Sequence, residues 1–163
     1  MSLRDELLAA NEKGRASYNG AGLTPAPRKH IAIVACMDAR FDPLAALGLE
    51  VGDAHVIRNA GGLSFDDTIR SLMISHRLLG TKQIVLVHHT DCGMERFSDE
   101  ELAAAVEQDT GHRPEFPLGS YRNVVEDVQH TAQRIAESPF LASKEIIGFV
   151  FDVESGELIP VDL

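Results

Sequence analysis

The chain has 163 residues, of which 44% are hydrophobic and 25% are charged, and these proportions are typical of one globular domain spanning residues 1–163. Its formal net charge of -10 leaves no broad positive surface for phosphate backbones or anionic lipid, which argues against nucleic-acid and membrane partners. No apolar segment reaches the roughly 18 residues of a membrane span or resembles a secretory signal, so the sequence predicts a cytoplasmic protein.

The first predicted element is an amphipathic helix over residues 3–18, in which Leu3, Leu7 and Leu8 are spaced for one face. The segment GLTPAPRK follows as an extended connector, because its prolines disfavour helix. The leucine face has no obvious core within the chain. This apolar face must therefore pack on some other surface.

Four short runs rich in β-branched residues predict buried strands, at residues 30–36, 54–58, 83–88 and 146–152. Helical patterns lie between them, at residues 43–47, 66–79, 99–108 and 121–137. This alternation predicts an α/β fold, with a mainly parallel four-stranded central β-sheet flanked by helices.

Chemically active side chains follow three of these strands. They are Cys36 and Asp38 after the first strand, Arg58 and Asn59 after the second, and His89 and Cys92 after the third. The carboxyl ends of parallel strands share one edge of a sheet, and ligands of open α/β sheets bind at that edge. The sequence therefore predicts a single site there.

The residue types at these positions favour zinc. Cys36 and Asp38 are two residues apart, so in extended backbone their side chains leave on one face, and Arg40 can follow. With His89 and Cys92 they form a plausible tetrahedral set of two thiolates, an imidazole and a carboxylate. Pairing of Arg40 with Asp38 would draw the carboxylate off the metal and leave an open position. The alternative is a closed zinc site that only braces the fold.

The motifs CMDAR, HVIRNAGG and HHTDCG resemble those of beta-class carbonic anhydrases in order and approximate spacing. The resemblance covers about residues 28–155 and is greatest to a shorter bacterial branch of the family. It implies zinc-dependent, reversible hydration of carbon dioxide to bicarbonate and a proton by zinc-bound hydroxide. It also implies one Zn²⁺ per chain and a homodimer, with a tetramer as a further possibility. In such a dimer the arm formed by residues 1–27 would pack on the partner subunit; the alternative is an arm exposed in a monomer.

The resemblance also assigns roles to individual residues. Cys36, His89 and Cys92 would be the permanent zinc ligands, and Asp38 and Arg40 the catalytic dyad, with Asp38 as an alternative fourth ligand in a closed state. The substrate pocket would contain Arg58, Asn59, Gly61 and Gly62. Two departures from the commonest family pattern, Ala60-Gly61-Gly62 and Met94, fall around this pocket and bear on substrate range and rate.

Other polar residues have several possible roles. His88 is expected to pack or to relay protons rather than to bind metal, because neighbours on a strand face opposite ways. Asp91 could orient a ligand, accept a proton or cap the following helix. His55 and His76 are expected to be structural.

Three alternative functions remain open from the sequence. On the same fold and metal, the substrate could be carbonyl sulfide or carbon disulfide. A non-catalytic zinc-binding or bicarbonate-sensing protein would keep Asp38 permanently on the metal. A thiol redox protein would instead use Cys36 and Cys92 as a reversible disulfide.

Overall fold

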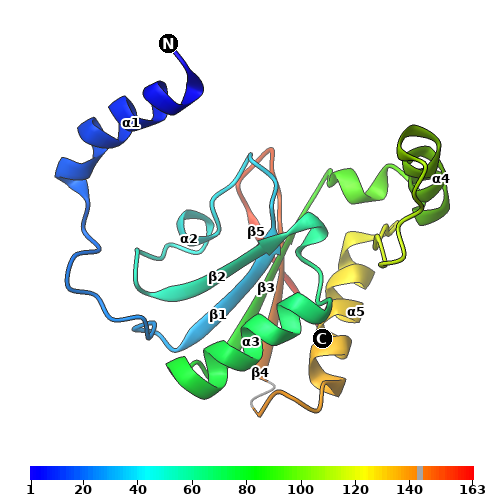
Figure 1. Cartoon of the computed structure of the whole chain (residues 1–163). Coiled ribbons are helices and arrows are strands. Elements are labelled where there is room, and N and C mark those ends of the chain that lie inside the picture. Colours follow the sequence, from blue (N-terminus) through cyan, green and yellow to red (C-terminus); the bar gives the residue numbers. More distant parts are fainter. Residues whose placement is uncertain (143–144) are drawn as a thin grey trace.

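A five-stranded sheet forms the centre of the protein (Figure 1). The structure is a computed structural model and describes residues 1–142 and 145–163. The strands lie in the order β2-β1-β3-β4-β5, with bounds β1 Ile31–Cys36, β2 Ala54–Asn59, β3 Gln83–His89, β4 Glu145–Phe151 and β5 Leu158–Val161. Strands β1 to β4 pair in parallel and β5 is antiparallel to β4. The predicted α/β fold with a mainly parallel sheet is confirmed.

The sheet has five strands, so the predicted number of four is wrong. The additional strand, β5, has only four residues and contains Pro160, a combination that gives little strand signal in a sequence. It forms because the chain turns back after β4: the Asp152 side chain accepts hydrogen bonds from the amides of Glu154 and Ser155. Proline is tolerated there because β5 lies at the sheet edge.

The helices and short 3₁₀ turns lie close to the predicted positions. They are α1 Leu3–Gly14, η1 Arg15–Ser17, α2 Pro43–Ala46, η2 Ala60–Gly62, α3 Asp66–Leu79, η3 Gly93–Glu95, α4 Asp99–Thr110 and α5 Val124–Glu137. Helix α5 begins later than predicted, because the Asn123 side chain accepts hydrogen bonds from the amides of Val125 and Glu126 and so sets the first turn. None of the helices described is long and apolar enough to cross a membrane.

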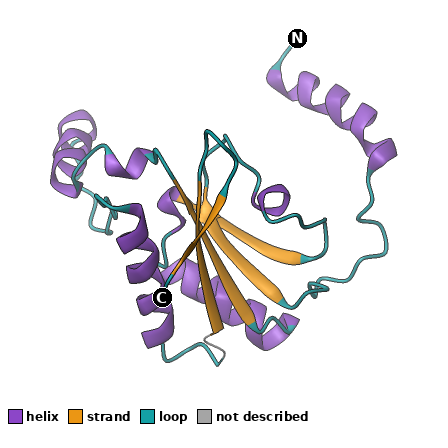
Figure 2. Cartoon of the chain, turned by 180° about the vertical axis from the view of Figure 1, so that it is seen from behind, coloured by secondary structure: helices purple, strands orange, loops and turns teal. Residues whose placement is uncertain are grey.

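Both faces of the sheet are covered. Helices α3 and α5 pack on one face, where Leu72 and Val128 join alternate residues of β1 and β3 in a buried cluster (Figures 1 and 2). On the other face, Phe41 and Leu63 cover the remaining residues of these strands, and this second cluster includes both cysteines. Strands β1 and β3 are therefore buried along almost their whole length, as predicted. The prediction of a buried strand is wrong for β2, which has no buried residue because it lies at the sheet edge, and β4 is only partly buried.

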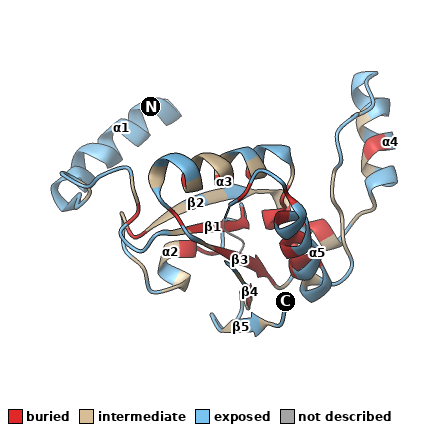
Figure 3. Ribbon diagram, turned by 90° about the horizontal axis from the view of Figure 1, so that it is seen from below, coloured by how far each residue is buried: buried red, intermediate tan, exposed pale blue. Residues whose placement is uncertain are grey.

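Every residue of helix α1 is exposed, whereas each of the other α-helices has at least one buried residue (Figure 3). It stands apart from the sheet, and Leu3, Leu7 and Leu8 are 70%, 60% and 59% exposed (Figure 1). A capping box at Ser2 and Asp5 begins the helix, so local hydrogen bonds rather than packing define it. Its packing on a partner subunit stays a prediction.

Candidate metal centre

Three ligand-type side chains meet at the carboxyl end of the sheet. Cys36 is the last residue of β1, His89 is the last residue of β3, and Cys92 follows after a short turn. One ligand atom from each lies within 4.8 Å of the other two, and all three residues are buried. The two sulfur atoms are 3.9 Å apart. The site predicted from the strand ends is therefore assembled as one cluster.

The His89 ring is oriented for a metal. Its Nδ1 lies 2.9 Å from the Thr90 carbonyl oxygen, which can only accept, so Nδ1 carries the proton and donates. Nε2 is then left with a free lone pair, and it has no hydrogen-bond partner among the described residues although it is buried. A ligand histidine is usually fixed in this way by its other nitrogen. With two thiols beside it, the nitrogen fits Zn²⁺.

Thr90 also ties this ligand to the neighbouring strand. Its amide donates to the Phe151 carbonyl at 3.0 Å, and the Val153 amide donates to its Oγ1 at 3.1 Å. The Phe41 ring packs against His89 with centroids 5.5 Å apart. The hydrogen bonds through Thr90 and the contact with the Phe41 ring therefore fix the position of the His89 side chain.

The pKa values of the two cluster thiols shift in opposite directions. The Cys92 thiol interacts with the Cys36 sulfur and, together with the amides of Asp38 and Gly61, lowers the pKa of Cys36. The same interaction raises the pKa of Cys92, and burial raises it further. Cys36 therefore ionises first, and a bound cation would favour the second thiolate, since metal binding to thiols releases protons.

Asp38 and Arg40 form a bidentate ion pair beside the cluster. Arg40 Nε donates to Asp38 Oδ1 at 3.0 Å, Nη2 donates to Oδ2 at 2.9 Å, and the Arg40 amide also donates to Oδ1 at 2.8 Å. These hydrogen bonds lower the pKa of Asp38 to about 2. Asp38 Oδ2 lies 3.8 Å from His89 Nε2, so the carboxylate is ionised, close to the cluster and held by the arginine.

Arg40 has a second acidic partner that the sequence reasoning missed. Its Nη1 donates to Asp91 Oδ2 at 2.7 Å, and Arg96 donates to the other oxygen of the same carboxylate. Asp91 therefore does not cap the following turn, whose N-cap is Cys92 and has no side-chain cap. No local pattern links Arg40 and Asp91, because they are 51 positions apart.

Arg58 and Asn59 brace the loops that follow the strands. Arg58 Nε donates to the Cys36 carbonyl at 2.9 Å, and its Nη2 donates to the Asp38 carbonyl at 2.6 Å. Asn59 Nδ2 donates to the Leu63 carbonyl, and its Oδ1 accepts from the Leu63 amide, both at 2.8 Å. Both residues also border a cavity of about 410 Å³ together with mainly apolar side chains.

Gly62 is required by the geometry of the cluster. Its φ of 76° lies in the left-handed region, and a Cβ there would be 3.0 Å from both the Ala35 carbonyl carbon and the Cys36 nitrogen. Gly61 also has a left-handed φ, of 82°, and its amide points toward the Cys36 sulfur. Neither glycine lines the cavity bordered by Arg58, so their contribution to the site is through the backbone.

The comparisons with known proteins identify the family. Residues 31–158 match the family model described as carbonic anhydrase. Beta-carbonic anhydrase 1 of Mycobacterium tuberculosis is 50% identical over 162 residues, covering 99% of both chains. The chain belongs to the beta-carbonic anhydrase family.

Two further relatives are similar to this carbonic anhydrase over most of its length. A solved carbonic anhydrase from Streptococcus mutans superposes with a TM-score of 0.93 at 36% identity, covering 99% of each chain. A carbon disulfide hydrolase of Acidithiobacillus thiooxidans is 36% identical over 150 residues, which cover 78% of this chain and 75% of that protein. The predicted resemblance is confirmed, and the fold also includes a protein named for another substrate.

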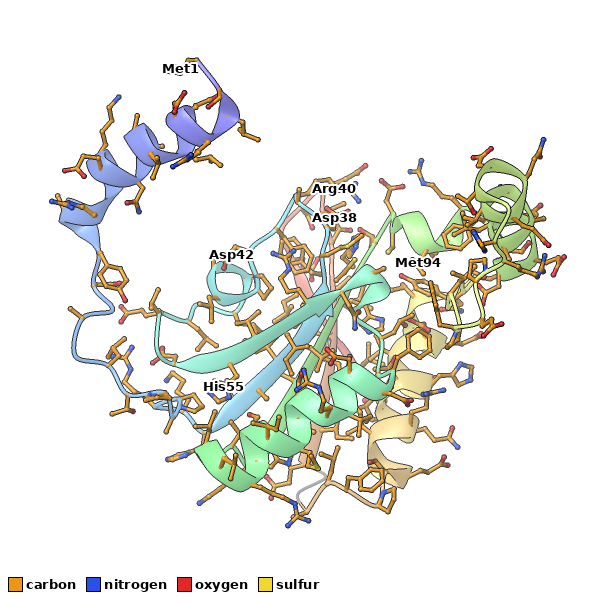
Figure 4. All side chains as sticks on the ribbon, viewed as in Figure 1. Met1, Asp38, Arg40, Asp42, His55 and Met94 are labelled. Carbon is orange, nitrogen blue, oxygen red and sulfur yellow. The ribbon has the colours of Figure 1, made fainter. Side chains whose placement is uncertain are left out.

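The remaining histidines of this carbonic anhydrase lie outside the ligand set. His88 is fully buried, with Nε2 3.2 Å from the Gly62 carbonyl and Nδ1 3.1 Å from an Asp127 oxygen. His55 lies at the opposite end of the sheet from Asp38 and Arg40 (Figure 4), where it contacts Ser75 Oγ and the Pro25 carbonyl. Burial lowers the pKa of His76. The contacts of His88 and His55 fit structural roles, and both ring nitrogens of His76 are buried without a hydrogen-bond partner among the described residues.

Proposed function

We propose that this chain is a zinc-dependent carbonic anhydrase that catalyses the reversible hydration of carbon dioxide to bicarbonate and a proton. One observation carries the proposal: the buried cluster of Cys36, His89 and Cys92 lies beside the ion pair of Asp38 and Arg40. The 50% identity to a beta-carbonic anhydrase over 99% of both chains supports the same reaction. One Zn²⁺ per chain would be held by the three cluster residues.

The chemistry needs a nucleophile and a group that orients it. Bound zinc would supply a Lewis-acidic centre that lowers the pKa of water. Asp38, ionised and fixed by Arg40, accepts a hydrogen bond from the nucleophile and directs its lone pair toward the substrate carbon. Arg58 donates hydrogen bonds to the carbonyl groups of Cys36 and Asp38, and these bonds fix the metal ligand and the carboxylate relative to each other.

The substrate is expected to approach from the cavity beside Arg58 and Asn59. The other residues that border it include Ala60, Phe65 and Met94, so the wall is largely apolar and suits an uncharged gas. Figure 4 places Met94 at the same end of the sheet as Asp38 and Arg40. Gly61 and Gly62 support this pocket through the backbone.

The exposed surface supports a homodimer, and the two cysteines support a cytoplasmic location. The exposed leucines of α1 need an apolar surface, and β2 is an edge strand of the described sheet with no strand on its outer side. A second copy can supply both contacts. The free cysteines of the cluster suit a reducing compartment, since thiol ligands are lost when they oxidise.

A second candidate function is hydrolysis of carbon disulfide or carbonyl sulfide on the same site. The 36% identical carbon disulfide hydrolase favours this possibility. Carbonic anhydrase activity is better supported, because the identity to the mycobacterial protein is higher and extends over nearly the whole chain. Parallel assays with the three substrates would separate the two functions.

The decisive experiment is stopped-flow carbon dioxide hydration as a function of pH, with zinc measured on the same sample. We expect about one zinc per chain, consistent with the single Cys-His-Cys cluster among the described residues, and a rate that rises toward alkaline pH. Two thiolates cancel the charge of the ion and weaken its pull on the water proton, which is the reason for the alkaline rise. Zinc-loaded protein without hydration at any pH would contradict the proposal.

A further inference from the structure

Asp91 holds Arg40 through a different edge of the guanidinium from the one that binds Asp38. Its carboxylate accepts a hydrogen bond from Arg40 Nη1 at 2.7 Å, and its carbonyl oxygen accepts from Arg40 Nη2 at 2.9 Å. Arg96 donates to the second oxygen of the same carboxylate. Two acidic and two basic side chains thus alternate in the order Asp38, Arg40, Asp91 and Arg96, and their charges balance.

The bonds to Asp91 use a large part of the hydrogen-bonding capacity of Arg40. A guanidinium has five N–H donors in a plane, and two of these hold Asp38 at 3.0 and 2.9 Å. Two more hold the side chain and carbonyl of Asp91. Because the Arg40 side chain is 43% exposed, these contacts rather than surrounding packing determine its orientation.

The backbone of Asp91 allows this arrangement. Its φ is 55°, in the left-handed region that few residues other than glycine adopt, although aspartate and asparagine adopt it more readily than most. At this conformation both the carbonyl and the carboxylate of Asp91 reach Arg40. The turn therefore connects His89 with Cys92 and also presents two hydrogen-bond acceptors of Asp91 to Arg40.

We propose that Asp91 is a positioning residue that keeps Asp38 off the metal by holding Arg40. The proposal rests on the proposed function, because it takes Cys36, His89 and Cys92 as metal ligands. Asp38 Oδ2 is only 3.8 Å from His89 Nε2, so a small movement would bring the carboxylate to the ligand position that must stay open. Asp91 and Arg96 oppose this movement by restraining the arginine that grips Asp38.

The test measures how readily the open position accepts an exogenous anion. Cobalt-substituted protein is titrated with thiocyanate at one fixed pH, and binding is followed in the visible absorption spectrum. Asp91→Gly removes the carboxylate while tolerating the left-handed backbone, and Asp91→Asn keeps the size and one acceptor. Glu107→Gln is the matched control, because it removes one charge from an exposed arginine pair on α4, where Arg113 Nη1 lies 3.2 Å from Glu107.

We expect Asp91→Gly to weaken thiocyanate binding about tenfold, the equivalent of roughly 1.4 kcal/mol, because Asp38 then competes for the metal. Asp91→Asn should give a smaller effect in the same direction, and Glu107→Gln should bind as the unmodified protein does. In an Asp38→Ala background the Asp91 substitutions should have no effect, since the competing carboxylate is gone.

Two results would overturn the proposal. One is unchanged thiocyanate affinity in Asp91→Gly, and the other is an equal loss of affinity with and without Asp38. Loss of cobalt from both Asp91→Gly and the double variant would also count against it, because Asp91 would then support the ligand turn itself. Failure of the proposed function is recognised separately, as unmodified zinc protein that has no hydration activity.

Discussion

At the carboxyl end of the sheet, side chains from distant parts of the chain bond to one another, whereas the N-terminal arm leaves its leucines exposed. Arg40 and Asp91 are 51 positions apart and yet paired, while Leu7 in α1 is 60% exposed. The contacts described in the first region are all made within one chain. The second has an apolar face without a partner in that chain, so the contrast indicates where a second copy is expected to bind.

The largest effect is expected from removing a cluster sulfur. Cys92→Ala should reduce bound zinc from about one per chain to nearly none and abolish hydration, because the remaining thiolate and imidazole bind the ion weakly. It should also lower the thermal midpoint, since metal binding contributes to folding. Metal analysis and calorimetry on the same preparation test this. A variant that keeps its zinc would remove Cys92 from the ligand set.

Removing Asp38 should separate reaction from metal binding. Asp38→Ala is expected to lower kcat/KM about 100-fold or more, because the group that orients the nucleophile is lost. Its zinc content should stay close to that of the unmodified protein. Stopped-flow kinetics and metal analysis provide the two measurements, and a parallel loss of zinc would show that Asp38 is needed for binding.

Gly62 tests how tightly the end of β1 is packed. Gly62→Ala should destabilise the fold by about 2–4 kcal/mol, because the new Cβ meets backbone atoms 3.0 Å away and the left-handed φ of 76° adds strain. Gly156 has the same φ of 76° and nothing within 4 Å of its Cβ, so Gly156→Ala should cost only about 1 kcal/mol. Denaturant unfolding compares them, and equal losses would refute the packing argument.

The arm should matter for assembly more than for the fold of one chain. Deletion of residues 1–22 should shift sedimentation from dimer toward monomer, because the exposed leucines of α1 are removed. The far-ultraviolet circular dichroism should lose only the helical signal of α1, and the zinc content should change little, since α1 buries no residue in its own chain. Unchanged dimerisation would show that the arm does not form the interface.

The smallest effect concerns the point where the arm meets the sheet. Hydrogen bonds from the Glu50 amide and then from Arg28 lower the pKa of Asp53. Its stabilising contribution is therefore complete above about pH 4, its unfolded pKa, and is lost as the pH falls through the lower folded pKa. Thermal midpoints of Asp53→Asn and the unmodified protein should differ modestly at pH 7 and converge as the pH falls below the folded pKa of Asp53. A difference that is constant with pH would exclude a role of the charge.

Much of the fold and the cluster could be predicted because both depend on strong local signals. The apolar runs ending at Cys36 and His89 indicate strands and also the edge at which their last residues meet. The β5 strand gave a weak signal, because an edge strand of four residues needs little apolar patterning. The pairing of Arg40 with Asp91 depends on a left-handed turn and on loops from two strands, which no local pattern contains.

The hydrogen bond from His89 Nδ1 to the Thr90 carbonyl has a consequence for how the protein acquires its ion. The imidazole tautomer is set by the chain's own backbone, and two further hydrogen bonds anchor Thr90 to Phe151 at the end of β4 and to Val153 in the turn after it. Metallation thus requires no search among ring orientations. The ring nitrogen that would bind the ion is selected by the backbone of the same chain.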